Sequence, residues 1–255
     1  MFQKDPIKLT PLTKPLRIHF TGDQVVLPPQ VTKKIADHWE RLTKKNPHLF
    51  NGDAFTVTAY ADNPDAIEVE LAETKYAHNL YSETFDAGEH AFRVIHSACL
   101  VITSDNTFVV GQMAQSTARA GKVCCSGGGI DRGDIRGDSI DLEYSTAHEL
   151  REELGIDPYG SHVESFKPVY VKTGGPLGKI TVLYELRTKL TSADIAKSYK
   201  KFVSSLVAEG KEIEFDQIFL VNNTSDAIES FVSDHQSNLD EYITLLFQAE
   251  NKYTL

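Results

Sequence analysis

The feature that most constrains this chain is a glycine-rich segment followed, after a short interval, by a helix with three glutamates. Residues 126–134 read Ser-Gly-Gly-Gly-Ile-Asp-Arg-Gly-Asp, and residues 148–156 read His-Glu-Leu-Arg-Glu-Glu-Leu-Gly-Ile. Because an α-helix turns about 100° per residue, Glu149, Glu152 and Glu153 fall within an arc of roughly 100°. Gly155 follows them as a helix stop. Any fold that contains this helix must place three like charges side by side.

Like charges three and four residues apart on a helix repel each other, so this face needs compensation. Carboxylate oxygens are the ligands that Mg²⁺ and Mn²⁺ prefer, and a divalent cation balances such charges. The alternative is a solvated face, because glutamate is a strong helix former. The upstream glycines favour the metal site, since bare backbone at Gly128 and Gly129 allows a phosphate to approach closely.

These residues resemble the box of the Nudix hydrolases, which reads G-x5-E-x7-R-E-U-x-E-E-x-G-U, with U an aliphatic residue. Residues 128–134 match its first part, with Asp134 in place of glutamate, and residues 149–156 match its second part. The two parts are separated by thirteen residues, 135–147, instead of seven. His148 stands where the family has arginine, and histidine cannot copy the fork of donors that arginine offers a carboxylate.

The resemblance implies an α/β protein, a Nudix-like α/β/α sandwich with a mixed sheet, that acts as a Nudix-type pyrophosphatase. It implies that Glu149, Glu152 and Glu153 bind Mg²⁺ or Mn²⁺, with Asp134 as a weaker match. The cation would polarise a diphosphate oxygen and lower the pKa of the attacking water. Glu152 and Glu153 are the catalytic candidates, because either could serve as the base.

Further candidates lie outside the box. Glu212, Glu214 and Asp216 near a predicted strand are candidates for an additional ligand or base, and a solvated strand edge is the alternative. Arg119 and Lys122 precede the glycines and are candidates for contact with the diphosphate, with ordinary surface cations as the alternative. The same alternative holds for two arginines that follow the glycines, Arg132 and Arg136.

A second resemblance covers more of the chain. Residues 39–41 (Trp-Glu-Arg), 46–52 (Asn-Pro-His-Leu-Phe-Asn-Gly) and 81–84 (Tyr-Ser-Glu-Thr) precede a box with an insert. This order is similar to the eukaryotic Nudix group that splits UDP-glucose and UDP-galactose, which implies cleavage of a UDP-sugar to UMP and a sugar 1-phosphate. ADP-ribose or a dinucleotide is an alternative substrate. A non-catalytic Nudix-fold nucleotide-binding module is a further alternative, although retention of all three glutamates favours catalysis.

Composition limits the possible partners. A net charge of −10 over 255 residues argues against an extended nucleic-acid partner and leaves room for a small nucleoside diphosphate derivative. No apolar run approaches the roughly 20 residues that span a bilayer, so no membrane partner is expected. The first residues lack the apolar region of a signal peptide. Three cysteines form neither a disulfide framework nor zinc spacing, which fits the reducing cytoplasm.

Hydrophobic patterning predicts two parts. Residues 1–88 form a small N-terminal β-α-β-β subdomain, and residues 89–255 form the Nudix-like domain, with the joint near 86–89. In the first part we expect a strand at 16–20, a helix at 29–45 and a hairpin of 55–60 with 67–71. In the second part we expect further strands and helices besides the glutamate helix: strands at 97–103, 107–112, 122–125, 169–172, 179–186 and 213–221, and helices at 192–208, 226–232 and 239–249.

Overall fold

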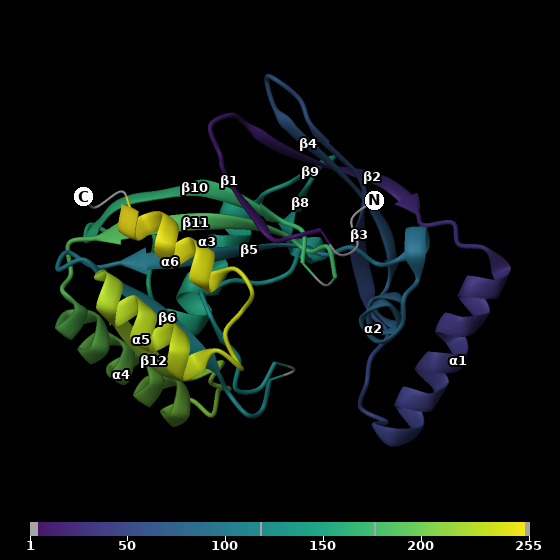
Figure 1. Cartoon of the computed structure of the whole chain (residues 1–255). Coiled ribbons are helices and arrows are strands. Elements are labelled where there is room, and N and C mark those ends of the chain that lie inside the picture. The colour runs from purple at the N-terminus through teal and green to yellow at the C-terminus, as the bar shows by residue number, and fades with distance from the viewer. Residues whose placement is uncertain (1–4, 118, 176, 253–255) are drawn as a thin grey trace.

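The computed structural model describes residues 5–117, 119–175 and 177–252, and it contains two mixed β-sheets (Figure 1). In the described residues, the larger sheet, sheet A, has seven strands, with β11 and β5 parallel and the other neighbours antiparallel. Its strands in spatial order are β1 (Lys8–Pro11), β10 (Val163–Thr173), β11 (Ile180–Thr188), β5 (Ile95–Ile102), β6 (Thr107–Met113) and β12 (Phe215–Asn222), and β7 (Val123–Cys124) also pairs with β6. The smaller sheet, sheet B, runs β3 (Asp53–Asp62), β4 (Ile67–Lys75), β2 (Leu16–Gln24), β9 (Ser139–Ile140) and β8 (Ile135–Arg136).

Six α-helices lie within the described residues. They are α1 (Pro29–Lys45), α2 (Tyr76–Thr84), α3 (Leu142–Leu154), α4 (Ser192–Ala208), α5 (Ser225–His235) and α6 (Ile243–Lys252), with short 3₁₀ turns at Gly88–His90 and Arg132–Asp134. Among the described helices, none has the length and apolar character needed to cross a membrane.

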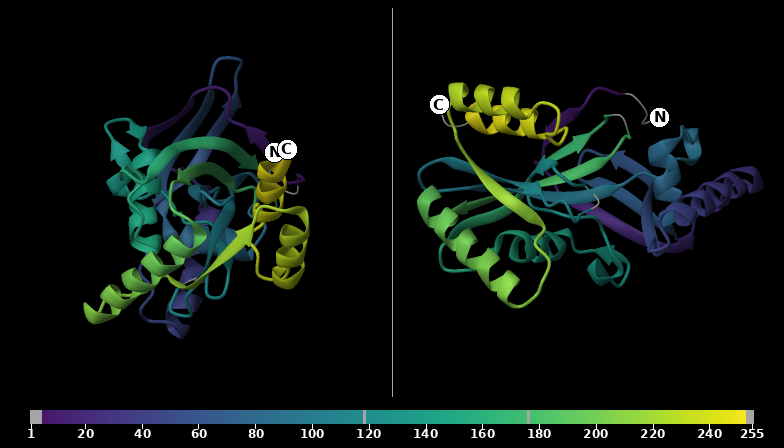
Figure 2. Two further views of the ribbon diagram at one scale, coloured as in Figure 1. Left: turned by 90° about the vertical axis from the view of Figure 1, so that its left-hand side faces the viewer. Right: turned by 90° about the horizontal axis from the view of Figure 1, so that it is seen from below.

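Helices cover both faces of sheet A (Figure 2). Successive side chains of β5 point to opposite faces, as they do in any strand. Cys99 and Val101 join the core formed with α3 and α4, whereas Ala98 and Leu100 join the core formed with α5 and α6. The predicted α/β/α sandwich with a mixed sheet is therefore confirmed.

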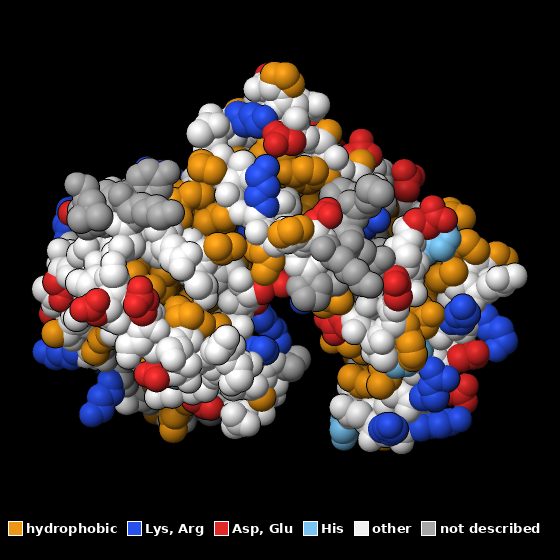
Figure 3. Space-filling view, in the orientation of Figure 1, with side chains coloured by type: hydrophobic (Ala, Val, Ile, Leu, Met, Phe, Trp, Pro, Cys, Tyr) orange, Lys and Arg blue, Asp and Glu red, His pale blue; other side chains and the backbone are white. Residues whose placement is uncertain are grey.

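The expected elements of the N-terminal part are present: β2, α1 and the β3–β4 hairpin follow one another in the predicted order. Two connections cross the predicted division into residues 1–88 and 89–255. Strand β1 pairs with β10 of sheet A, and the β8–β9 hairpin, which lies between the two parts of the box, pairs with β2 of sheet B. The division itself stays a prediction. Figure 3 shows the surface hollowed between the part built on sheet A and the part that carries α1 and α2.

Several boundaries differ from those expected. Strand β10 begins six residues before the predicted start at 169 and runs through Pro168, where its register with β11 shifts. A proline has no N–H for the ladder, and this irregularity accommodates it. Helix α6 begins at Ile243 rather than 239. Strand β1, helix α2 and the β8–β9 hairpin had no sequence prediction.

Candidate active site

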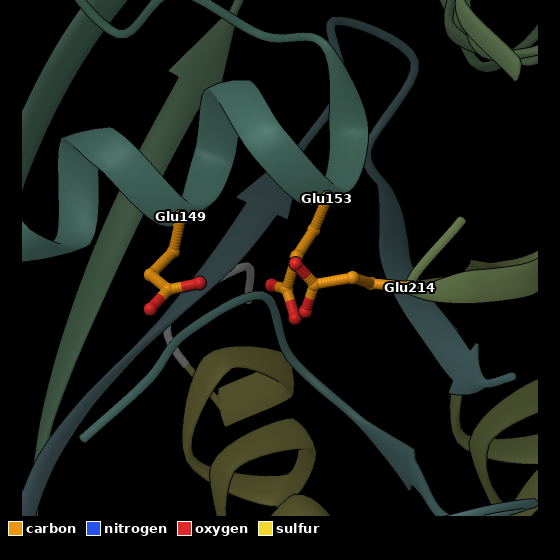
Figure 4. Close-up of side chains that lie close together, drawn as sticks. All are labelled: Glu149, Glu153 and Glu214. Atoms are coloured by element: carbon orange, nitrogen blue, oxygen red, sulfur yellow. The ribbon is translucent and has the colours of Figure 1, made fainter. Parts of the chain in front are cut away.

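Three glutamates from two distant parts of the chain converge beside the C-terminal half of α3 (Figure 4). Glu149 and Glu153 lie one turn apart on α3, and Glu214 directly precedes β12. One carboxylate oxygen from each lies within 4.8 Å of the others. Glu153 is buried, and Glu149 and Glu214 are partly buried, so the three side chains do not spread into bulk solvent. These three residues are called the acidic cluster below.

The local sequence of α3 fixes two members of this cluster. Asp141 caps the helix by accepting a hydrogen bond from an amide of the first turn at 2.9 Å. Leu150 and Leu154 are buried against sheet A and anchor the helix. Gly155 ends the helix in the left-handed region, at φ +67°, and a Cβ there would lie 2.6 Å from the Phe202 ring. The predicted helix stop is confirmed.

Glu214 is positioned by its neighbours in the backbone. Its carbonyl accepts a hydrogen bond at 2.7 Å from the amide of the residue after β6. The next residue, Phe215, is fully buried against Gly111, where a Cβ would lie 2.3 Å from its ring. Glu212 and Asp216 are exposed and lie outside the acidic cluster. Of the three candidates near this strand, the structure brings only Glu214 to α3.

The glycine segment lies directly between β5 and the glutamates of α3. The Gly127 amide donates a hydrogen bond to Glu153 Oε2 at 2.8 Å. A Cβ at Gly127 would lie 2.2 Å from the Ser97 carbonyl oxygen, and a Cβ at Gly128 would lie 1.8 Å from Glu149 Oε1. The absence of side chains is thus needed for packing against the acidic cluster. Gly129 faces open space, so approach of a ligand to its backbone stays a prediction.

The electrostatics of the cluster favour a bound cation. Burial, followed by the charges of nearby carboxylates, raises the pKa of Glu149 to about 7. Burial also raises the pKa of Glu153 well above its usual range, and burial together with other glutamates raises the pKa of Glu214. Charges held together in this way are unfavourable without compensation. A divalent cation with oxygen ligands supplies that compensation, so the residues present fit Mg²⁺ or Mn²⁺.

Glu152, the third predicted ligand, does not join the acidic cluster. Its side chain is 53% exposed and its Oε2 lies 3.2 Å from Nδ1 of His148, one turn earlier on α3. The His148 ring in turn stacks on Tyr144. Glu152 is nevertheless close enough for its charge to raise the pKa values of Glu149 and Glu214. Helical spacing predicts correctly that Glu152 lies on the same side of α3 as Glu149 and Glu153. Its side chain, however, turns toward His148 and away from the acidic cluster.

Asp134, the weaker match to the box, has a structural position. It is 5% exposed, and its carboxylate accepts a hydrogen bond from the Asp131 amide at 2.9 Å. The Asp131 carboxylate reciprocates by accepting from the Gly133 amide, which closes a capping box around the 3₁₀ turn. Asp134 therefore holds the loop between the glycines and the β8–β9 hairpin.

The predicted cations have different surroundings. Arg119 donates to Asp240 at 2.7 Å, so its charge is already balanced. Lys122 is partly buried and forms no side-chain ion pair within the described residues. Arg132 pairs with Asp53 at 2.6 Å and with Glu73 at 2.7 Å, and so ties the loop after the glycines to sheet B. A contact of Arg119 or Lys122 with a diphosphate stays a prediction.

Comparison with known proteins gives only distant likenesses. No family model and no curated protein sequence matches the chain. Among solved structures, the MutT protein from Methanosarcina mazei Go1 is 15% identical, with a TM-score of 0.39 over 64% of this chain and 95% of that chain. The NUDIX domain of Shewanella oneidensis NrtR, solved with ADP ribose, is 12% identical, with a TM-score of 0.39 over 69% of this chain and 97% of that chain.

A third solved structure is a bifunctional NMN adenylyltransferase/ADP ribose pyrophosphatase from Francisella tularensis, complexed with AMP and a manganese ion. It is 12% identical, with a TM-score of 0.40 over 69% of this chain and 48% of that chain. Likenesses of this extent do not assign the chain to a family. The function therefore has to be inferred from the acidic cluster and the sequence around it.

Proposed function

We propose that this chain is a Nudix-type pyrophosphatase, which uses a divalent cation to hydrolyse the diphosphate of a nucleoside diphosphate linked to another moiety. The observation that carries the proposal is the acidic cluster, in which carboxylates of α3 and of the residue before β12 converge beside the glycine segment. Oxygen-only ligands suit Mg²⁺ and Mn²⁺ better than soft metals. The match of residues 149–156 to the box gives the cluster its proposed chemistry.

In this proposal Glu149, Glu153 and Glu214 hold the cation. When bound, the cation neutralises charge on the diphosphate and lowers the pKa of water near it. The Gly127 amide donates to the Glu153 carboxylate and orients it, and the bare backbone of Gly128 leaves room for Glu149. These contacts preorganise the site, which is the main requirement for stabilising charge on a reacting phosphate.

Glu152 is the proposed base. It lies beside the cluster but outside it, and its contact with His148 is exposed, so little free energy is needed to break that contact. Glu152 then accepts the proton of the water that attacks phosphorus, while the bridging oxygen leaves on the other phosphate. Glu153 is buried and hydrogen-bonded, which makes it better suited to binding the cation than to proton transfer.

We propose UDP-glucose or UDP-galactose as the substrate, with UMP and a sugar 1-phosphate as products. Support comes from residues 39–41, 46–52 and 81–84 in the N-terminal part, which resemble the UDP-sugar group in order and spacing. ADP-ribose and dinucleotides share the same diphosphate and are the substrates to compare. Discrimination among them depends on the group attached to the diphosphate rather than on the acidic cluster.

The test is a Mg²⁺-dependent cleavage assay on UDP-glucose, UDP-galactose, ADP-ribose and a dinucleoside diphosphate. Glu153→Gln is expected to reduce turnover by about 10³-fold, because it removes a buried ligand. Glu143→Gln is the matched control, since this exposed glutamate on the same helix lies outside the acidic cluster and accepts a hydrogen bond from the Tyr159 hydroxyl at 3.0 Å. Equal turnover in Glu153→Gln and the unmodified protein would contradict the proposal. Binding of these diphosphates without turnover would favour a binding module.

A further inference from the structure

A separate cavity lies where the N-terminal segment, the β8–β9 hairpin and sheet A meet. Its volume is about 610 Å³, within the range of small-molecule sites. Its walls come from residues 12–16 and Ile18, from residues around the hairpin and the start of α3, and from Pro168, Val182 and Tyr184 of sheet A. The acidic cluster contributes no lining residue, so this cavity is distinct from the proposed active site.

The cavity has an apolar floor suited to a flat ring system. Leu12, Leu16 and Pro168 are partly exposed and line it. Leu12 and Leu16 pack against the buried cluster that contains Ile18, Val182 and Tyr184. The Tyr184 ring is fixed by stacking on Phe166, with centroids 5.3 Å apart. A ring system in the cavity can cover the apolar side chains of this floor.

Arg136 adds a positive charge to the wall of the cavity. Its guanidinium donates to the Gly133 and Ile135 carbonyls, the latter at 3.1 Å, and lies 4.6 Å from the Tyr144 ring centroid. In the described parts of the chain no carboxylate forms an ion pair with it. An arginine held in this way by backbone and an aromatic ring is oriented for an anion.

The other charged side chains that line the cavity already have partners in the described residues. Lys14 pairs with Asp62 at 2.5 Å and also donates to the Asn63 carbonyl. The Asp141 carboxylate caps α3. Arg136 is therefore the group in the wall that is available to select the charge of a ligand.

We propose that this cavity binds a small molecule with a flat apolar ring system and one anionic group. The ring lies on Leu12, Leu16 and Pro168, and the anionic group lies at Arg136. The hairpin that supplies Arg136 belongs to the thirteen-residue segment between the two parts of the box, where the Nudix pattern has seven. The longer segment thus builds a site at the start of the helix that carries Glu149 and Glu153.

Two fluorescent dyes of the same ring system test this proposal. One is 8-anilinonaphthalene-1-sulfonate, which is anionic, and the other is N-phenyl-1-naphthylamine, which is neutral. Titration of the metal-free full chain is expected to show saturable binding, tighter for the sulfonate. Arg136→Gln is expected to weaken sulfonate binding about tenfold while changing binding of the neutral dye less than about twofold, because one charge-assisted hydrogen bond is lost.

A bulky residue at the opening of the cavity tests whether the dyes bind inside it. Thr13 is exposed and lines it, so Thr13→Trp is expected to weaken both dyes at least about tenfold by occupying the space. Ala36→Trp is the control, because Ala36 is exposed and lines a different, 380 Å³ pocket beside α1. Ser139→Trp replaces Thr13→Trp if circular dichroism shows that the latter is unfolded.

Three results would overturn the inference: no saturable binding to the folded chain, full binding in both mouth variants, or loss of binding in Ala36→Trp. Equal loss of the two dyes in Arg136→Gln would remove the role of the anion. The experiment uses neither metal nor diphosphate. Glu153→Gln, which tests the pyrophosphatase proposal, is expected to leave dye binding unchanged, so the two proposals fail separately.

Discussion

The two ends of α3 are held in different ways. At the C-terminal half, the glutamate side chains lie against bare backbone: Gly127 donates to Glu153, and Gly128 leaves room for Glu149. At the N-terminal end, the helix continues from the β8–β9 hairpin, which pairs with β2 of sheet B. One end depends on atomic close packing within a few residues of the box. The other end depends on pairing with a distant part of the chain.

This difference predicts different tolerance to substitution. Close packing is disturbed by a single added carbon, because protein interiors contain few voids and a catalytic carboxylate has to be placed precisely. The hairpin end is joined to sheet B by backbone pairing and by the ion pairs of Arg132, none of which includes a residue of the acidic cluster. Changes near the glycines should therefore affect activity strongly, whereas changes near the hairpin should affect mainly the joining of the two sheets.

The largest contrast is expected between two adjacent glycines. In Gly128→Ala, the new Cβ would lie 1.8 Å from Glu149 Oε1 and must displace that carboxylate, so turnover should fall about 10²-fold. In Gly129→Ala, the Cβ would meet no atom of the chain within 4 Å, so Glu149 is not displaced and the loss of turnover should be smaller. Steady-state assays with saturating Mg²⁺ measure the difference. Similar effects of both substitutions would contradict the packing described for Glu149.

The acidic cluster should also make the metal-free protein less stable at higher pH. The pKa of Glu149 is raised from its ordinary value of 4.5 to about 7 by burial and neighbouring carboxylates. The stability associated with the protonated form is present below about pH 4.5 and is lost as the pH rises through about 7. Glu149→Gln should therefore raise the free energy of unfolding by about 2–3 kcal/mol at pH 8 and by little at pH 4.5.

Urea unfolding of the metal-free chain at pH 4.5, 6 and 8 measures this effect. Glu143→Gln is again the matched control, because Glu143 is exposed on the same helix. A stability gain of Glu149→Gln that does not depend on pH would show that the burial of its charge is not the cause. With saturating Mg²⁺ the order should reverse, since the cation stabilises only the carboxylate form.

The affinity of the acidic cluster for a divalent cation should also depend on the protonation of Glu149. Ligand carboxylates have to be deprotonated, and the pKa of Glu149 is raised to about 7. The affinity for Mn²⁺ is expected to fall at least about tenfold between pH 8 and pH 6, because protons on carboxylates with raised pKa values then compete with the cation. Calorimetric titration with Mn²⁺ at several pH values measures it. An affinity that is constant over this range would contradict ligation by Glu149.

Much of this organisation could be predicted from the sequence, and the helices show why. The bounds of α1 and α4 were predicted correctly, because apolar spacing and flanking residues mark them locally. Glu149 and Glu153 could be predicted to lie side by side, because residues four apart lie on the same face of an α-helix. The direction of the Glu152 side chain does not, because contact with His148 decides between conformations that the helix allows equally.

Long-range pairing explains what the sequence did not predict. Glu212, Glu214 and Asp216 were equivalent candidates, and the choice of Glu214 depends on where β12 meets β6. Strands β8 and β9 have only two residues each, so they carry no periodicity of their own. The Glu149 carboxylate occupies the space where a side chain at Gly128 would begin, and this contact could not be predicted from the sequence.

A smaller effect is expected at the hairpin end. Arg132→Gln removes the pairs with Asp53 and Glu73 that join the loop after the glycines to sheet B. The melting temperature should fall, because the buried Glu73 carboxylate loses its ion-pair partner. Turnover should stay within about threefold, because neither pair includes a residue of the acidic cluster. Differential scanning fluorimetry and the cleavage assay measure both quantities. A loss of turnover as large as that of Gly128→Ala would show that the two ends of α3 are not independent.

The central claim is that Glu149, Glu153 and Glu214 together bind a divalent cation, and thermal unfolding with Mn²⁺ tests it most directly. Glu214→Gln removes the member that lies outside the box, and Glu212→Gln changes an exposed glutamate two residues away. Mn²⁺ is expected to raise the melting temperatures of the unmodified protein and of Glu212→Gln equally, and to raise that of Glu214→Gln much less. An equal rise in all three proteins would contradict the claim.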